Sequence, residues 1–162
     1  MVLDGNNVSN VSGVQIYKYN NLTFSGVTVK NINGSWGMRF GLYGADENAD
    51  KSYELTIKDC IIQTVTNTSL EGIITVNTKK INILNNVIRD CDLTNASMVS
   101  IFLLCEDVKI SGNHIENAVN DYGLLDLTGC NQVIVSGNTL KNTGSTGNNA
   151  IVNRNTRDVV ID

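Results

Sequence analysis

The chain contains 162 residues, with a formal net charge of −4 and an isoelectric point near 4.9. This length suits one domain spanning residues 1–162, and the acidic balance argues against a nucleic-acid-binding face. Hydrophobic residues make up 41% of the chain but aromatic residues only 6%, which predicts a thin, aliphatic core. No apolar run approaches the roughly 18 residues that a membrane-spanning helix needs.

A ten-residue pattern, Val-x-Ile-x-Gly-Asn-x-Ile-x-Asn, recurs along the chain. Its clearest copies are residues 108–117 and 133–142. Aligned on the second aliphatic position, the copies predict a solenoid of about six turns with roughly 26 residues per turn. The copies span residues 1–10, 22–31, 55–64, 81–90, 108–117 and 133–142, and a seventh begins at Val159. Their anchor residues are Leu3, Phe24, Ile57, Ile83, Ile110, Val135 and Ile161.

Each copy also predicts a strand followed by a bend. Apolar and polar residues alternate before the Gly-Asn pair, which is strand periodicity with one face toward a core. Gly and Asn tolerate the left-handed backbone of a sharp bend. Stacked copies place the Asn side chains above one another, where their amides can form a buried hydrogen-bond ladder. This column contains Asn6, Asn86, Asn113 and Asn138, with Val27 and Cys60 in the other two copies.

Two more apolar segments complete each turn. One follows the bend, and the other precedes each copy, from Val14 and Ile16 to residues 150–152. Each turn is therefore expected to hold three short strands that bury their apolar faces only against neighbouring turns. The column after the bend contains Val8, Val29, Ile62, Ile88, Ile115 and Leu140. A polar column two residues further on contains Asn10, Asn31, Thr64, Asp90, Asn117 and Asn142.

These three-strand turns and the Gly-Asn bend resemble the right-handed parallel β-helix of the pectate-lyase-like superfamily over essentially the whole chain. The expected fold class is therefore all-β, a β-solenoid. The superfamily includes lyases, hydrolases, epimerases, phage tailspikes and non-catalytic adhesins. The resemblance thus implies a polysaccharide or oligosaccharide partner without fixing a reaction. The residues themselves predict no cofactor, and calcium is implied by the resemblance alone.

Both ends of the chain stop inside the repeating pattern. The chain is therefore expected to be a segment of a longer β-helix without end caps. The alternative is a short protein whose ends stack on other copies of itself as a homo-oligomer.

The resemblance places a site on the outer face of the first strand of each turn. There Asp126 interrupts an apolar run, and Arg154 is expected one turn along and within its reach. An acid beside an arginine, with Arg39 on the same face, suits uronate binding or assisted proton abstraction. An ordinary exposed ion pair is the alternative.

Aromatic residues near the same face suggest contact with sugar rings. Trp36 lies in a glycine-rich bend just before a first strand, and Tyr17 is expected at an outward position of another. Aromatic rings in such positions stack on the apolar faces of sugars. The alternative for Trp36 is that it covers the core at the bend.

Other reactive residues predict no further site. His114 is the only histidine and is expected to be exposed and without a partner. Cys105 and Cys130 are expected to stack as thiols, because neighbouring parallel strands pose their sulfur atoms poorly for a disulfide. The other two cysteines lack metal-site spacing. The insertion 43–53 contains three acids but matches no calcium-binding pattern, so no metal site is predicted.

Two functions from different classes fit the sequence. In the first, the chain is a carbohydrate-engaging part of a polysaccharide-degrading lyase or hydrolase, with Asp126, Arg154 and Arg39 on its substrate face. In the second, it is a non-catalytic structural or adhesive shaft of a phage tail or bacterial surface protein. The absence of recognised lyase and polygalacturonase motifs favours the second. Both place the parent protein in an extracellular, cell-surface or virion setting, although the chain has no targeting signal.

Overall fold

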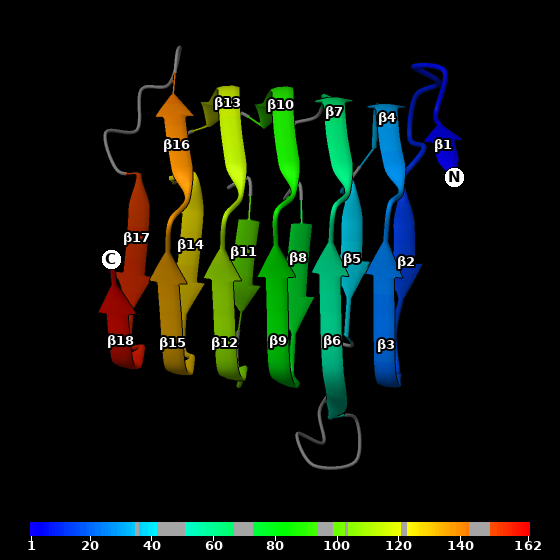
Figure 1. Cartoon of the computed structure of the whole chain (residues 1–162). Helices are drawn as coiled ribbons and strands as arrows, with labels where there is room; N and C mark the ends of the chain where they lie inside the picture. Colours follow the sequence, from blue (N-terminus) through cyan, green and yellow to red (C-terminus); the bar gives the residue numbers. More distant parts are fainter. Residues whose placement is uncertain are drawn as a thin grey trace.

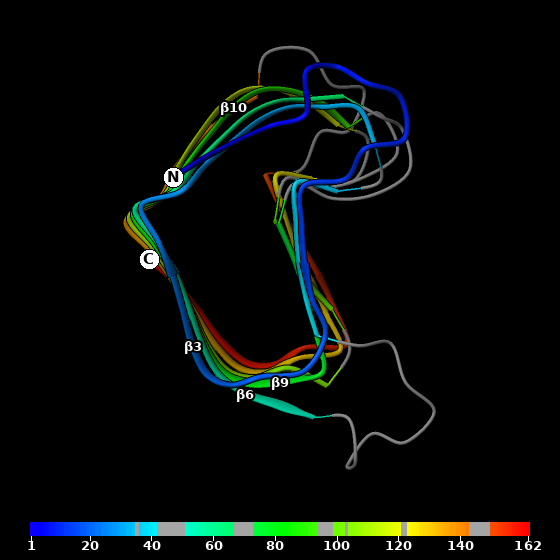
Figure 2. The same ribbon diagram turned by 90° about the vertical axis from the view of Figure 1, so that its right-hand side faces the viewer.

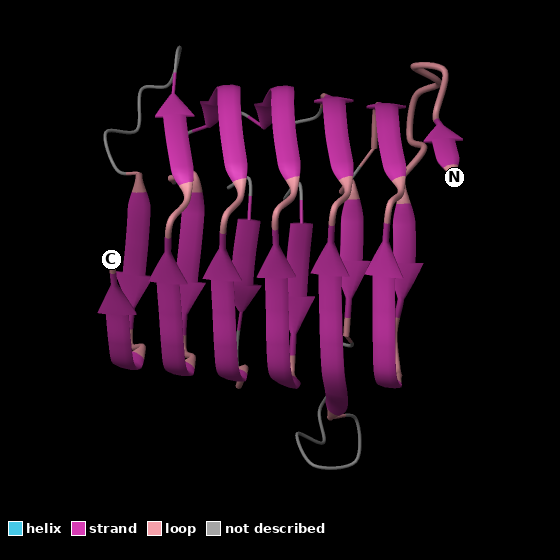
Figure 3. Ribbon diagram, in the orientation of Figure 1, coloured by secondary structure: helices cyan, strands magenta, loops and turns pink. Residues whose placement is uncertain are grey.

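The chain forms a right-handed parallel β-helix. The computed structural model describes residues 1–34, 36–41, 51–66, 73–93, 99–102, 104–120, 123–142 and 150–162. These residues form strands and loops but no helix (Figure 3), and hence no helix that could span a membrane. In Figure 1 the front strands point upward, the rear strands point downward and each turn advances from right to left, which defines a right-handed coil.

Three parallel sheets of six strands each surround one core (Figure 2). Sheet 1 contains β1 (Val2–Asp4), β4 (Thr28–Ile32), β7 (Ile61–Val65), β10 (Val87–Leu93), β13 (His114–Asn120) and β16 (Thr139–Asn142). Sheet 2 contains β2 (Val14–Ile16), β5 (Met38–Phe40), β8 (Ile73–Val76), β11 (Val99–Phe102), β14 (Leu125–Thr128) and β17 (Ile151–Arg154). Sheet 3 contains β3 (Asn20–Ser25), β6 (Ser52–Lys58), β9 (Thr78–Leu84), β12 (Glu106–Ser111), β15 (Asn131–Ser136) and β18 (Arg157–Ile161).

The register confirms the solenoid and corrects its first turn. Leu3 pairs with Val29 in sheet 1, exactly one 26-residue period away, and not with Phe24 in sheet 3 as the alignment of the copies predicted. The predicted spacing of 21 residues between Leu3 and Phe24 was therefore a misalignment. Asn6, Val8 and Asn10 do not belong to the columns assigned to them. The chain makes about five complete turns, because each of the six strands of sheet 1 lies one turn from the next.

The core is made of apolar rows that run through successive turns. Ile62, Ile88 and Ile115 stack in sheet 1 with no exposed surface. Among the described residues, ring-to-ring contacts lie near the N-terminal end, where the Phe40 ring meets Phe24 edge-on with ring centroids 5.8 Å apart. The predicted aliphatic interior is thus confirmed among the described residues.

Four columns of left-handed residues recur in the described turns. The predicted one precedes the ladder position, and its residues have φ between 54° and 68°. The other three were not predicted, although one coincides with the predicted polar column except at Asn142, which pairs with Ala118. In two columns the left-handed residue falls between register pairs inside a strand and bends that strand, as a β-bulge does, and in the other two it lies between strands. The columns inside strands are 31, 64, 90 and 117, and 21, 54, 80, 107, 132 and 158; those between strands are 26, 59, 85, 112 and 137, and 77, 104, 129 and 155.

The asparagine ladder forms as predicted in three turns. Asn86 Nδ2 donates to Asn113 Oδ1 at 3.0 Å, and Asn113 Nδ2 donates to Asn138 Oδ1 at 2.9 Å. Each amide also donates to a main-chain carbonyl, as Asn113 Nδ2 does to Ile83 O at 2.9 Å. Cys60 occupies the next position, where its backbone N–H donates to Asn86 Oδ1 at 3.0 Å. Asn86 and Asn113 are almost fully buried, so the ladder satisfies polar groups that water does not reach.

We predict that Asn113→Ala lowers the free energy of unfolding by about 1–3 kcal/mol, because it leaves buried ladder and main-chain groups unpaired. Urea unfolding measures the loss. The exposed Asn153→Ala is the control and should change stability by no more than about 0.5 kcal/mol. Equal effects of the two substitutions would show that the ladder does not contribute to stability.

We predict that Ile115→Ala costs about 2–5 kcal/mol, because the side chain is fully buried between neighbouring turns. The matched control is Ile134→Ala, whose side chain points outward and is 47% exposed. That change should stay within about 1 kcal/mol. An unchanged unfolding midpoint for Ile115→Ala would contradict the inward orientation of this column.

Candidate functional site

The outer face of sheet 2 holds most of the residues that the sequence singled out. Arg39 pairs with Gln15 in the preceding strand, and Asp126 occupies the same outward row further along the sheet. Two strands, β8 and β11, lie between Arg39 and Asp126. Three strand spacings place their Cα atoms about 14 Å apart. These two residues therefore share a face but do not meet.

Arg39 instead forms a cluster with aromatic residues near the N-terminal end of sheet 2. Its guanidinium carbon lies 4.8 Å from the centroid of the Trp36 ring and 5.9 Å from that of the Tyr17 ring. Gln15 Nε2 donates a hydrogen bond to the Tyr17 hydroxyl. We call Gln15, Tyr17, Trp36 and Arg39 the Arg39 cluster. The structure thus brings together three of the five predicted site residues.

Glycines in the two adjacent turns allow Trp36 to reach this position. A Cβ atom on Gly34 would lie 2.1 Å from the carbonyl oxygen of Val11, and one on Gly13 would lie 2.0 Å from that of Gly37. Both approaches are too close for any side chain. The Gly13 N–H donates to the Trp36 carbonyl oxygen at 2.9 Å, which fixes the backbone of the bend. The glycine-rich bend noted in the sequence is therefore a point of close contact between turns.

The cluster has unsatisfied hydrogen-bond donors. Arg39 Nε and Trp36 Nε1 are buried, and neither has a hydrogen-bond partner in the described part of the chain. Tyr17 is 47% exposed, so the cluster is open to solvent on one side. A buried donor without a partner is costly, and a ligand oxygen could relieve that cost only if the side chains moved to expose these two atoms.

Asp126 is more enclosed than the sequence suggested. It is 7% exposed, and Thr128 Oγ1 donates to its Oδ1 at 2.7 Å. In the register Asp126 lies opposite Val152, and Arg154 lies opposite Thr128. Arg154 is exposed, one strand along and two residues beyond the register partner of Asp126.

The prediction that His114 has no partner is wrong. His114 Nε2 lies 3.0 Å from Glu116 Oε2, two residues along β13 on the outer face of sheet 1. Alternating residues of a strand point to the same side, which explains why this pair forms. The pair lies on a different face from the Arg39 cluster, so it does not contribute to the same site.

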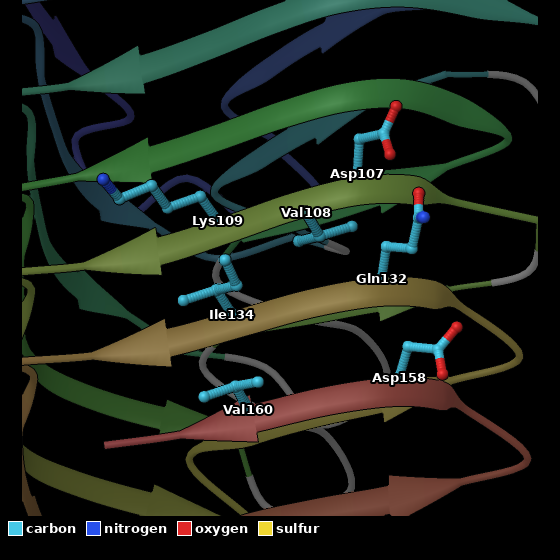
Figure 4. Close-up of a pocket in the computed structure, with 7 residues that line it drawn as sticks. All are labelled: Asp107, Val108, Lys109, Gln132, Ile134, Asp158 and Val160. Carbon is cyan, nitrogen blue, oxygen red and sulfur yellow. The ribbon is translucent and has the colours of Figure 1, made fainter.

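A groove on the outer face of sheet 3 was not anticipated from the sequence (Figure 4). Its volume is about 460 Å³, and it spans β12, β15 and β18. Inward and outward residues alternate along each strand, which places residues 109, 134 and 160 on the outer face. This alternation was the signal in the sequence that could have located the groove. Its lining contains Asp107, Val108, Lys109, Gln132, Ile134, Asp158 and Val160.

The described residues contain no group of three potential metal ligands. The acids Asp46, Glu47 and Asp50 of the long insertion lie outside the residues that the structure describes. The family-implied calcium therefore has no candidate ligand set in the described part of the chain.

All four cysteines are buried and none forms a disulfide, as predicted for Cys105 and Cys130. The Cys105 thiol and burial both raise the pKa of Cys130. Burial raises the pKa of Cys91 to about 11, from an ordinary value of 9.0. A thiol that resists ionisation is a poor nucleophile, so these residues serve packing.

The Cys91 pKa predicts a pH dependence of stability. A raised pKa means that the folded chain keeps the proton longer than the unfolded chain, so stability is complete below pH 9 and falls as the pH rises toward 11. The Cys91 contribution is up to about 3 kcal/mol. Urea unfolding of Cys91→Ser, which cannot titrate in this range, should show a smaller loss between pH 8 and 11 than the unaltered chain. Equal losses of unfolding free energy in the variant and the unaltered chain would show that Cys91 does not contribute to the pH dependence.

Comparison with known proteins adds no relative. No family model matches the chain, and no curated protein is similar to it. The parallel β-helix is thus established by the structure, and membership of the pectate-lyase-like superfamily stays a prediction from the sequence pattern.

Proposed function

We propose that this chain is a carbohydrate-engaging β-helix domain that binds a polysaccharide or oligosaccharide on the outer face of sheet 2. The observation that supports this function best is the Arg39 cluster, in which one guanidinium contacts both the Trp36 and Tyr17 rings. The cluster combines exposed aromatic surface with unpartnered donors in a single place.

A sugar ring has apolar C–H faces and polar hydroxyl or carboxylate groups, and the Arg39 cluster offers a contact for each. Aromatic faces pack against the C–H groups of a pyranose ring, and amphipathic aromatic residues are enriched at interfaces that are partly wet. The guanidinium of Arg39 can donate charge-assisted hydrogen bonds to hydroxyl or carboxylate oxygens. The cation–π contacts hold the guanidinium in place before a ligand arrives.

Binding without cleavage is the form of this function that the geometry favours. Asp126 is the candidate acid or base of the same face, but it is 7% exposed and already accepts a hydrogen bond from Thr128. At about 14 Å from Arg39 it cannot act with that residue on one bond. Arg39 would hold a polymer while Asp126 and Arg154 lie further along its path. A non-catalytic binding or adhesive module is consistent with this separation.

Trp36 is the only tryptophan of the chain, so its fluorescence reports binding at the cluster directly. We expect a saturable change in its emission with at least one member of a panel of pectin, polygalacturonate, alginate, glycosaminoglycan and bacterial capsule preparations. Tyr17→Ala and Arg39→Ala should each weaken that binding by about tenfold, or about 1.4 kcal/mol. Arg89→Ala, on sheet 1, is the matched control and should leave the affinity unchanged.

Two results would contradict the proposal. One is a fluorescence response to no glycan of the panel. The other is an equal loss of affinity in Arg89→Ala and Arg39→Ala when both variants unfold at the same urea concentration as the unaltered chain. Reducing ends and unsaturated-uronate absorbance, followed with and without calcium, test cleavage separately. Cleavage that Asp126→Asn abolishes would make the chain an enzyme and overturn the preference for binding alone.

A further inference from the structure

We propose that the groove on sheet 3 is a second glycan-binding site, and that it takes a cationic amino-sugar polymer. This inference rests on the proposed carbohydrate-engaging function, but it uses different residues on a different face. Figure 4 shows two rows of side chains across β12, β15 and β18. Asp107, Gln132 and Asp158 form one row, and Lys109, Ile134 and Val160 form the other.

The backbone brings the acidic row to one side of the groove. Asp107, Gln132 and Asp158 are left-handed residues with φ between 51° and 55°, and each falls between register pairs of its strand. They recur once per turn, so the two carboxylates lie two strand spacings, or about 10 Å, apart. Two acceptors separated along the solenoid axis suit a linear polymer that runs in the same direction.

The carboxylates of this row differ from the other acids of sheet 3. Glu106 is paired with Lys51 at 2.6 Å and with Lys79 at 3.2 Å, and Glu54 is paired with Lys80 at 2.7 Å. Within the described residues, Asp107 and Asp158 make neither a salt bridge nor a side-chain hydrogen bond. Lys109 lies in the groove, but its ammonium group points away from Asp107 in Figure 4. The acidic side of the groove therefore complements a cation.

The other row supplies apolar surface. Ile134 is 47% exposed and Val160 is 57% exposed, and the two are register partners on adjacent strands. A ligand that satisfies both rows has an apolar face and a positive charge on the same rigid unit. The ring of an amino sugar has both in mildly acidic solution, because its C–H face is apolar and its amine is then protonated. A uronate polymer, in contrast, would bring carboxylates against carboxylates.

The test is calorimetric titration of the full chain, at a mildly acidic pH where amino-sugar amines are protonated and aspartates are ionised, with a glucosamine hexamer, its fully N-acetylated counterpart and poly-lysine of matched charge. We expect the glucosamine hexamer to bind about tenfold more tightly than the acetylated hexamer, which has no charge, and more tightly than poly-lysine, which has no ring face. Its affinity should also fall as the salt concentration rises.

Substitutions locate the site. Asp107→Asn with Asp158→Asn should abolish the preference for the glucosamine hexamer, and Asn tolerates the left-handed backbone that these positions require. Ile134→Thr with Val160→Thr should weaken binding of both hexamers. Asp59→Asn, another exposed left-handed acid, is the matched control and should have no effect.

The outcomes distinguish the two sites. A preference for the glucosamine hexamer that survives in Arg39→Ala and disappears in the double Asn variant supports the groove on sheet 3. If Arg39→Ala loses binding of the glucosamine hexamer and the double Asn variant keeps both the binding and the preference, the second site is overturned. The Arg39 cluster is then the glycan site. Equal or tighter binding of poly-lysine would assign the groove to a basic polypeptide and overturn the amino-sugar assignment.

Discussion

The pairing of each strand with its equivalents one turn away is the constraint on which the rest of this structure depends. In the described residues every sheet joins strands that are three elements apart in the sequence, always in parallel. A single turn of three short strands has no partner for its main-chain groups and no second layer for its apolar residues. Both needs are met only by stacking, so one residue of register decides which side chains are buried and which face outward.

The corners convert this stacking into a defined cross-section. Left-handed residues recur at four places in the turn, and the Asn86–Asn113–Asn138 ladder satisfies the buried polar groups at one of them. Because the bends repeat from turn to turn, with one register shift between β13 and β16, the outward rows between them stay aligned along the axis. Alignment of rows, and not any single strand, is what places Trp36 and Arg39 of one turn against Tyr17 of the turn before.

The outer faces are free of the packing constraint, and their chemistry differs from sheet to sheet. Sheet 2 presents aromatic rings around a guanidinium, and sheet 3 presents Asp107 and Asp158, which form no salt bridge with any described residue, beside exposed aliphatic side chains. Sheet 1 presents polar pairs such as His114 with Glu116. A rigid rod with several distinct faces suits the binding of extended polymers, since contacts can repeat along its length without any change of fold. The two proposed sites use this property on separate faces.

The sequence by itself determined the class of fold, the 26-residue period, the three strands per turn and the ladder, because all of them follow from a local pattern of apolar and polar residues repeated in phase. It missed the left-handed positions at Glu54, Lys80 and Gln132, because these residue types have no preference for that conformation and the inter-turn register imposes it. Only the tertiary structure decided that Leu3 stacks on Val29, that Arg39 meets Trp36 and that Asp126 is enclosed. Those contacts join residues from different turns or depend on how outward side chains cover one another, and the spacing of residues along the chain does not specify either.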